Sequence, residues 1–149
     1  GWLTKDAYHR RGSKMILEAL DLQLMTAKQE SVHILKPVTI EHVLPRGWTL
    51  ENYPLPELTE GQTPESQALY RSTILHTYGN LTLLTDSLNS AISNGAFSRK
   101  RPEIAAQSLL RMNSFFQNCG DNWNEQDITQ RGKELFKIAK QIWPYPKAE

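Results

Sequence analysis

The chain has 149 residues, of which 39% are hydrophobic and 22% are charged, a composition that is ordinary for a globular protein. Its length suits one domain with a single core. Cys119 is the only cysteine, which excludes an intramolecular disulfide and a zinc site built from several cysteines. The formal net charge of +1 excludes a strongly basic nucleic-acid binder, so any affinity for DNA must come from a local patch or from other parts of a larger protein.

The ends and the hydropathy of the chain indicate where the protein is located and whether it is part of a longer one. No apolar run approaches the roughly 20 residues that span a bilayer, and the N-terminus lacks the apolar core of a secretory signal. We therefore expect no membrane segment, and because the single cysteine fits an intracellular protein we expect a cytoplasmic location. The chain begins without Met and inside a helix-like pattern, so we expect a single domain over residues 1–149 that is a C-terminal fragment of a longer protein.

The first part of the chain predicts a helix, a strand and a loop. Apolar residues recur at helical spacing between Lys14 and Lys28, and we expect Ser13 to be the N-cap. The segment Val38–Leu44 alternates and is rich in β-branched residues, which predicts a short strand. Residues 46–62 are rich in Pro, Gly and Thr and predict a surface loop.

The middle of the chain predicts a second helix and a second strand. Thr63 followed by Pro64 is typical of an N-cap and the first helical position, and the helix should end before Gly79. Residues 80–85 predict the second strand. The two strands can pair as a hairpin that carries a long insertion.

The last part of the chain predicts three more helices. Asp86 or Ser87 should cap a short helix that contains Asn89, residues 101–103 should open another, and residues 125–143 should form the last. We expect an α+β fold that is mostly helical around a small two-stranded sheet. The apolar residues that we expect in the core here are Ile104, Leu109, Leu110, Met112, Phe115 and Phe116, together with the tryptophans Trp48, Trp123 and Trp143.

Four polar residues, in three segments of the chain, carry the chemistry that the sequence suggests. Glu41 and His42 precede Pro45, Asn80 opens the second predicted strand, and Asn89 follows Asn80 by nine residues on a predicted helix. The order strand, strand, helix is that of the ββα-metal fold.

These segments resemble known nucleases. Residues 40–45, Ile-Glu-His-Val-Leu-Pro, resemble the Asp/Glu-His-Ile-x-Pro signature of His-Asn-His (HNH) nucleases. Residues 78–85, followed by Leu88-Asn89, Ser93-Asn94, Phe97 and Lys100, resemble the C-terminal nuclease domain of GmrSD-type modification-dependent restriction enzymes and of related phosphorothioate-sensing defence nucleases. This motif core covers about residues 38–100, and the combination is far more specific than Glu-His-x-x-Pro alone.

The resemblance implies a metal-dependent DNA endonuclease that nicks or cuts both strands, and it implies a role for each motif residue. His42 would be the general base, and Asn80 would brace the His42 loop through hydrogen bonds. Glu41 and Asn89 would hold one divalent cation, Mg²⁺ or alternatively Mn²⁺. Asn89 departs from the His or Asp that many HNH nucleases have there. This chain also lacks their zinc-binding cysteine pairs, so we expect hydrophobic packing instead.

The residue types suit this chemistry. An imidazole with a pKa of about 6.5 is mostly neutral at cellular pH and can accept a proton from water. Mg²⁺ prefers oxygen ligands and usually keeps several waters, so a carboxylate and an amide oxygen suffice. Adjacent residues of a regular strand face opposite sides. Glu41 and His42 can therefore share a site only where the strand bends or ends, as the nearby Pro45 suggests.

A basic cluster follows the motif. Arg99, Lys100 and Arg101 precede a helix that Pro102 should open, and a helix N-terminus favours phosphate. We expect these three residues to contact DNA; the alternative is a solvated charge cluster. A second cluster, without support from the resemblance, consists of Arg10, Arg11 and Lys14.

Simpler interpretations compete at several positions. Asn94 before Gly95 is either a helix C-cap or a residue that supports the site. Asn80 after Gly79 also suits a turn, and Asn89 could face solvent. The remaining histidines, His9, His33 and His76, lie outside the motif, and we expect them to be non-catalytic.

The resemblance also implies a biological setting, which is the restriction of phage or other foreign DNA. The partners would be DNA and an upstream nucleotide-hydrolysing sensor domain of the same parent protein. One alternative function is a catalytically idle ββα module that binds DNA or another partner. Another is a small helical regulatory domain with accidental motifs, in which His42 and Asn89 would lie far apart.

Overall fold

The computed structural model describes residues 10–25, 37–107 and 109–146. Helices dominate these residues, and two short strands form one sheet, as the α+β prediction requires. In chain order the elements are α1 (Arg10–Met25), β1 (Thr39–His42), α2 (Pro64–Ile74), the 3₁₀ helix η1 (Tyr78–Asn80), β2 (Leu81–Leu84), α3 (Ser90–Ser93), α4 (Phe97–Ala105), the 3₁₀ helix η2 (Arg111–Gln117) and α5 (Glu125–Ile142).

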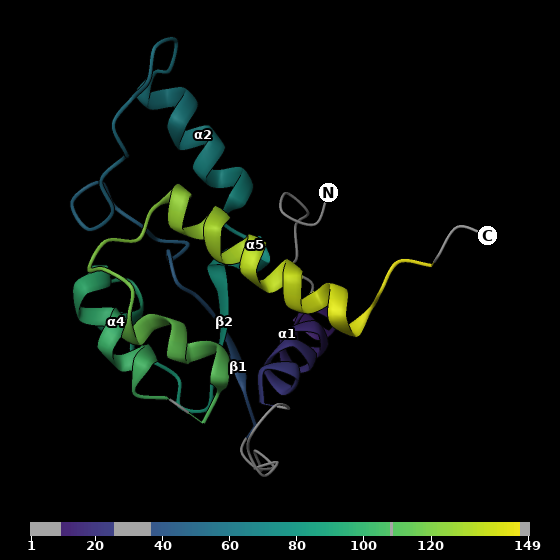
Figure 1. The fold of residues 1–149 in the computed structure, drawn as a ribbon. Coiled ribbons are helices and arrows are strands. Elements are labelled where there is room, and N and C mark those ends of the chain that lie inside the picture. The colour runs from purple at the N-terminus through teal and green to yellow at the C-terminus, as the bar shows by residue number, and fades with distance from the viewer. Residues whose placement is uncertain (1–9, 26–36, 108, 147–149) are drawn as a thin grey trace.

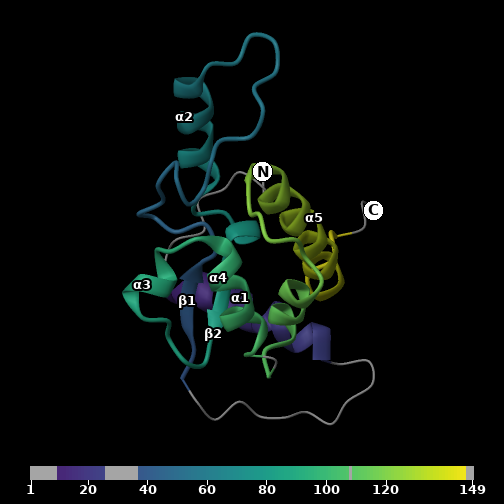
Figure 2. The same ribbon diagram turned by 90° about the vertical axis from the view of Figure 1, so that its left-hand side faces the viewer.

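The two strands pair in antiparallel fashion, with Glu41 opposite Thr82 and His42 opposite Leu81. The predicted hairpin with a long insertion is therefore confirmed. All four residues of β2 are buried, because helices cover both faces of the sheet (Figures 1 and 2).

Alternate side chains of β2 enter different parts of the core. Leu81 and Leu83 pack in one cluster with residues of α1 and α5, such as Leu17 and Leu135. Leu84 packs in a second cluster that includes Phe97 from α4. This alternation follows from the two-residue period of a strand.

The insertion between the strands contains α2, which begins as its sequence predicts. Thr63 is the N-cap, Pro64 follows it, and the Thr63 and Ser66 side chains form a reciprocal capping box. Arg71 anchors this helix, because its fully buried guanidinium pairs with Glu125 of α5 and also donates to the carbonyl oxygen of Tyr53. The insertion is therefore fixed to α5.

The 3₁₀ helix η1 packs closely against α5. A Cβ atom at Gly79 would clash with the carbonyl oxygen of Ile128, so only glycine allows this approach. Arg131 of α5 is buried and donates to the carbonyl oxygens of Tyr78, Gly79 and Leu81. These contacts hold the turn that carries Asn80.

The predicted N-cap of the first helix is wrong. α1 already begins at Arg10, so Ser13 lies inside the helix. Ser13 is buried there and its side chain forms a hydrogen bond with Tyr78. A tertiary contact, rather than capping, thus accounts for this serine. The expected helix end at Lys28 lies outside the described residues.

Two further helix starts differ from the predictions. Asn89, rather than Asp86 or Ser87, is the N-cap of α3, because its Oδ1 accepts a hydrogen bond from the Ile92 amide at 3.0 Å. α4 begins at Phe97, and Pro102 lies within it instead of opening it.

The core differs from the prediction at three apolar residues. Leu109, Phe115 and Trp143 are exposed, whereas the remaining predicted core residues are buried or half-buried. Among the described residues, no helix is both long and apolar enough to cross a membrane.

Candidate active site

Asn80 is fully buried where η1 meets β2, and its side chain joins three segments. Its Oδ1 accepts from the Leu44 amide at 2.8 Å and from the Trp123 indole at 3.0 Å. Its Nδ2 donates to the carbonyl oxygens of Leu44 and Leu75, both at 2.9 Å. The Asn80 side chain therefore braces the loop that follows His42, as the sequence led us to expect.

His42 is the last residue of β1 and is 8% exposed. Its Nε2 lies 2.9 Å from Nδ1 of His76, within hydrogen-bond distance, and the two rings meet edge to face. The sequence led us to expect His76 to be non-catalytic, but the structure places it against the candidate base. The other two histidines that we set aside, His9 and His33, lie outside the described residues.

Glu41 precedes His42 in β1, and its carboxylate is held by the helices that follow β2. Its Oε1 pairs with Nζ of Lys100 at 2.7 Å and accepts from the hydroxyl of Ser93 at 2.7 Å. Because β1 ends at His42, Glu41 and His42 both lie at the same end of the sheet. Their side chains have different partners there, since the Glu41 carboxylate contacts Lys100 and Ser93 while the His42 imidazole contacts His76.

Lys100 is fully buried, and this position does not suit the phosphate contact that we predicted. Besides Glu41, its Nζ donates to the carbonyl oxygens of His42 at 2.5 Å and of Ser93 at 2.8 Å. Burial lowers the pKa of the Lys100 ammonium, and the Glu41 carboxylate opposes this effect. The expected exposed position ahead of a helix is wrong, because α4 begins at Phe97 and Lys100 lies on its buried side.

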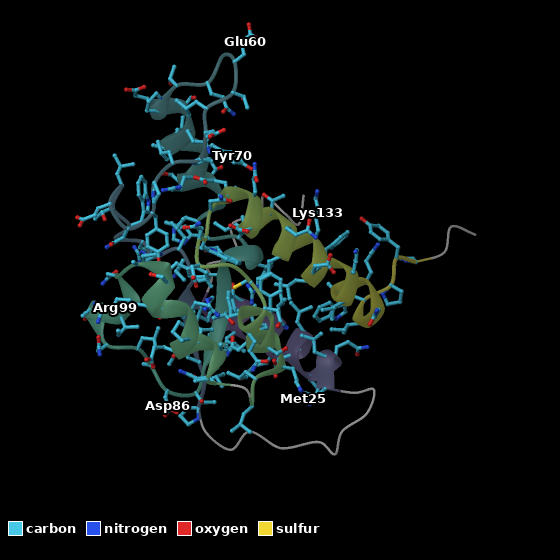
Figure 3. All side chains as sticks on the ribbon, turned by 60° about the vertical axis from the view of Figure 1, so that its left-hand side comes forward. Met25, Glu60, Tyr70, Asp86, Arg99 and Lys133 are labelled. Carbon is cyan, nitrogen blue, oxygen red and sulfur yellow. The ribbon has the colours of Figure 1, made fainter. Side chains whose placement is uncertain are left out.

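The two arginines that flank Lys100 are more exposed to solvent than Lys100 is. Arg99 is exposed, and Figure 3 shows it at the outer edge of the molecule. Arg101 is half-buried, pairs with Asp121 at 3.0 Å and donates to the carbonyl oxygen of Phe116. The cluster lies inside α4 rather than ahead of a helix, so the helix N-terminus argument is wrong. DNA contact by Arg99 stays a prediction.

Asn89, predicted as a metal ligand, and Asn94, predicted as a C-cap or a supporting residue, both cap α3. Asn89 is exposed at the N-cap, and no hydrogen bond links it to Glu41 within the part of the chain that the structure describes. Asn94 is the C-cap, and its Nδ2 donates to the Ser90 carbonyl oxygen at 3.2 Å, so the capping interpretation of Asn94 is confirmed.

The two residues expected to bind a metal, Glu41 and Asn89, carry oxygen donors of the kind that hard cations prefer. The hydrogen-bond partners of the Glu41 carboxylate within the described residues engage Oε1, which leaves Oε2 for a ligand. The amide oxygen of Asn89 has a second lone pair beyond its capping bond. No group of three or more His, Cys, Asp or Glu residues suited to a metal occurs in the described ranges. Such a donor set suits hydrated Mg²⁺ or Mn²⁺ better than zinc.

Two supporting residues escaped the sequence analysis. The Tyr53 hydroxyl donates to the carbonyl oxygen of Gly95 at 3.0 Å and so ties the insertion to the turn before α4. Burial, with the Glu41 charge adding to it, raises the pKa of this hydroxyl, which stays protonated. Trp123 was expected only in the core, yet its indole also holds Asn80. No local pattern marks either role.

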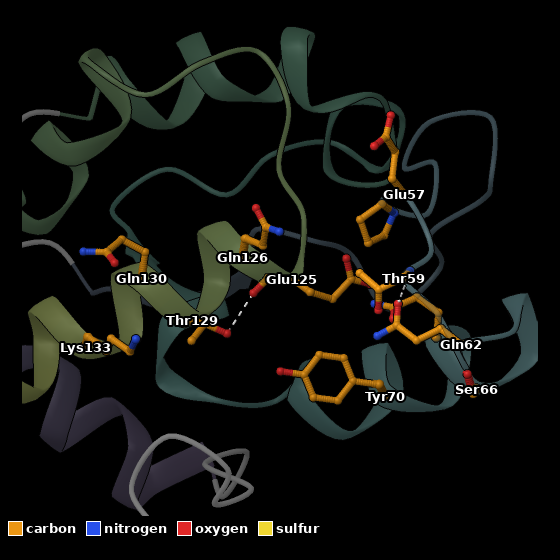
Figure 4. A pocket seen from close by; sticks show the side chains of 12 residues that line it. Glu57, Thr59, Gln62, Ser66, Tyr70, Glu125, Gln126, Thr129, Gln130 and Lys133 are labelled. Carbon is orange, nitrogen blue, oxygen red and sulfur yellow. Dashed lines mark hydrogen bonds between the residues drawn. The ribbon is translucent and has the colours of Figure 1, made fainter.

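A separate cavity of about 630 Å³ lies between the loop at residues 56–62, α2 and α5. Tyr70, Glu125 and Lys133 are among its lining residues (Figure 4). None of the motif residues lines it, so this cavity is not the candidate active site.

The braced histidine at the end of the hairpin, beside the buried Lys100–Glu41 pair, defines a candidate hydrolytic site on an α+β fold. The chain belongs to the family described as GmrSD restriction endonucleases, C-terminal domain, which it matches over residues 1–138. The resemblance to the C-terminal domain of GmrSD-type restriction enzymes is thereby confirmed, and the chain is a nuclease domain of the restriction-endonuclease type. Neither the curated proteins nor the solved structures that were compared gave a match.

Proposed function

We propose that this domain is an HNH-type endonuclease that hydrolyses phosphodiester bonds in DNA, with His42 as the general base. The single observation that supports this most strongly is the Asn80 side chain, whose two bonds to Leu44 fix the loop that follows His42. A base that is held in one orientation needs no reorganisation when it takes a proton, and positioned proton transfer contributes typically about 10²–10⁴-fold to the rate.

In the proposed reaction His42 takes a proton from water, and the water oxygen bonds to phosphorus. The bond between phosphorus and the leaving deoxyribose oxygen breaks, that oxygen takes a proton from solvent, and His42 releases its proton to solvent. Glu41 and Asn89 would hold one Mg²⁺ or Mn²⁺ ion, which when bound would neutralise phosphate charge and stabilise the leaving oxygen. Lys100 and Ser93 would keep the Glu41 carboxylate in place for that ligand.

The family supports a wider proposal about context. We infer that the domain acts on DNA in the restriction of phage or other foreign DNA, in the cytoplasm. An upstream nucleotide-hydrolysing sensor domain of the same parent protein would control it. These assignments rest on the family and on no contact in the structure.

A plasmid assay tests the proposed activity. Supercoiled plasmid is incubated with the chain and Mg²⁺, with the chain and Mn²⁺, and with the chain and a chelator. We expect nicked or linear products only with a metal, and a loss of about 10²–10⁴-fold for His42→Ala with an unchanged circular dichroism spectrum. DNA binding without cleavage under every metal condition would instead support the idle-module alternative. A folded His42→Ala protein that keeps most of the activity would remove His42 from the mechanism.

A further inference from the structure

We propose that His76 is the positioning residue of the His42 base, because it accepts the Nε2 hydrogen of His42 and so keeps Nδ1 of His42 unprotonated for water. The inference rests on the proposed function. The observation behind it is the distance of 2.9 Å between Nε2 of His42 and Nδ1 of His76, with ring centroids 5.0 Å apart and ring planes at 81°.

The hydrogen bond between the two imidazoles has two possible directions. A neutral imidazole carries one hydrogen, so one ring must donate and the other must accept. If His42 donates from Nε2, its Nδ1 keeps a lone pair and can act as a base. If His76 donates from Nδ1, the hydrogen of His42 sits on its own Nδ1 and its remaining lone pair is used in the bond. Only the first arrangement gives a competent base.

The fold holds both histidines at this distance. The Nδ2 group of Asn80 donates to Leu44, two residues after His42, and to Leu75, one residue before His76. One buried amide group therefore fixes both segments that carry the rings.

The backbone on the other side of His76 is fixed as well. The amide and the hydroxyl of Thr77 both donate to the Ile74 carbonyl oxygen, at 3.0 and 2.7 Å, and the Thr77 carbonyl oxygen accepts from the Asn80 amide. Thr77 is buried. The ring of His76 thus projects from a segment that is held before and after it, as a positioning role requires.

The pair also has a consequence for the charged form of the base. When Nδ1 of His42 takes the proton of water, the ring becomes an imidazolium and its Nε2 hydrogen points at the Nδ1 lone pair of neutral His76. A hydrogen bond from a charged donor is roughly twice as strong as a neutral one. His76 would therefore stabilise the product of the proton transfer while the transferred proton remains on His42.

Three variants at position 76 distinguish a role of His76 as a hydrogen-bond acceptor from a role in packing. The Oδ1 atom of Asn lies at the same bond separation from the backbone as Nδ1 of His, whereas the amide of Gln lies one bond farther out, and Leu offers no acceptor. With an end-labelled DNA duplex and saturating Mg²⁺, we expect His76→Leu and His76→Gln to lower kcat by about tenfold to a hundredfold. KM and the Mg²⁺ half-saturation should stay as in the parent, and His76→Asn should recover most of kcat. Parental kcat in His76→Leu, or no recovery in His76→Asn, would overturn the proposal.

A second measurement needs no cleavage and uses the unmodified chain. Nitrogen-15 NMR of histidine side chains at about pH 8, where an ordinary imidazole is neutral, reports which ring nitrogen carries the hydrogen. We expect His42 of the parent to carry it on Nε2. A hydrogen on Nδ1 of His42 would overturn the proposal. If the parent shows the expected tautomer but cuts no DNA under any metal condition, the hydrogen bond from His42 to His76 stands and the proposed nuclease mechanism fails.

Discussion

The indole of Trp123 donates a hydrogen bond of 3.0 Å to Oδ1 of Asn80, which links the segment before α5 to the loop of the candidate base. The same oxygen accepts from Leu44, and the Nδ2 atom of Asn80 reaches Leu44 and Leu75. The candidate site therefore depends on a residue 43 positions beyond Asn80 as well as on its own hairpin. Mutations in the segment before α5 should therefore change the position of the His42 loop.

Asn80→Ala should lower both stability and activity. The change leaves four buried hydrogen-bonding groups without their partner, and each such group costs about 1–3 kcal/mol when it is not rehydrated. We expect a loss of at least about 3 kcal/mol in the free energy of unfolding, measured by urea denaturation. Cleavage should fall by about a hundredfold or more at a temperature where the variant is still folded. A variant as stable and as active as the parent would contradict the brace.

Trp123→Phe tests the outermost bond of this network. Phenylalanine keeps most of the ring in the core but has no donor, while Asn80 keeps its bond to the Leu44 amide. We expect a modest loss of about 1 kcal/mol in the free energy of unfolding and a decrease of only a few-fold in kcat. Urea denaturation and single-turnover cleavage measure the two effects. A decrease in kcat as large as that of Asn80→Ala would mean that Trp123 has a direct part in the site.

Asn89 has a capping role that the structure shows and a metal role that is proposed. Asn89→Ser separates them, since serine is also a good N-cap but is too short to reach a metal in the same way. Asn89→Asp keeps the cap and adds a carboxylate. We expect similar melting temperatures for the parent and both variants. The Mg²⁺ concentration for half-maximal cleavage should rise in Asn89→Ser and fall in Asn89→Asp. Three superimposable Mg²⁺ titrations would leave Asn89 with its capping role alone.

Lys100→Met should destabilise the fold strongly. The change removes a buried cation, so the Glu41 carboxylate loses its ion-pair partner and keeps its hydrogen bond from Ser93, while two carbonyl oxygens lose the Lys100 donor. Breaking a buried ion pair from one side costs about 3–5 kcal/mol. Urea denaturation should show this loss, whereas Arg99→Met, a matched change at an exposed position of the same helix, should stay within about 0.5 kcal/mol of the parent. Equal stabilities of the two variants would contradict the buried role of Lys100.

What the sequence predicted well was local. Thr63 and Pro64 carry their own capping chemistry, so the start of α2 could be predicted from the residues themselves. The alternating pattern around Glu41 and His42 predicted β1, and the motif around Asn80 predicted the brace. The signals for α2 and β1 lie within those elements, whereas the brace joins Asn80 to Leu44 across 36 positions and was implied by the family resemblance of the motif.

What the sequence could not predict depends on contacts between distant segments. His76 reaches His42 because Asn80 draws two segments together, and 34 residues separate the two histidines. Lys100 was assigned to DNA because Pro102 suggested a helix start, but α4 begins at Phe97 and carries Lys100 into the interior. The residues next to Lys100 in the sequence do not indicate that it is buried, because the oxygens that stabilise its buried charge come from β1 and α3.

With Lys100 buried and Arg101 paired to Asp121, the DNA-contact prediction is concentrated on Arg99. The net charge of the chain is only +1, so its binding to DNA should be weak, independent of sequence and strongly dependent on salt. Arg99→Ala should flatten the plot of log affinity against log salt by up to about one unit, because one phosphate contact is lost. The rate of DNA cleavage at low salt should also be lower in Arg99→Ala than in the parent.

Lys133→Ala provides the control, because it removes the same charge from an exposed residue of α5 (Figure 3). Both variants reduce the formal net charge from +1 to 0, so a general electrostatic effect would change their slopes equally. We expect the slope to change for Arg99→Ala and to stay at the parental value for Lys133→Ala, as measured by fluorescence anisotropy over a salt series. Equal slopes for all three proteins would show that Arg99 faces solvent. The DNA path would then be sought at Arg10, Arg11 and Lys14 of α1, the second basic cluster that the sequence suggested.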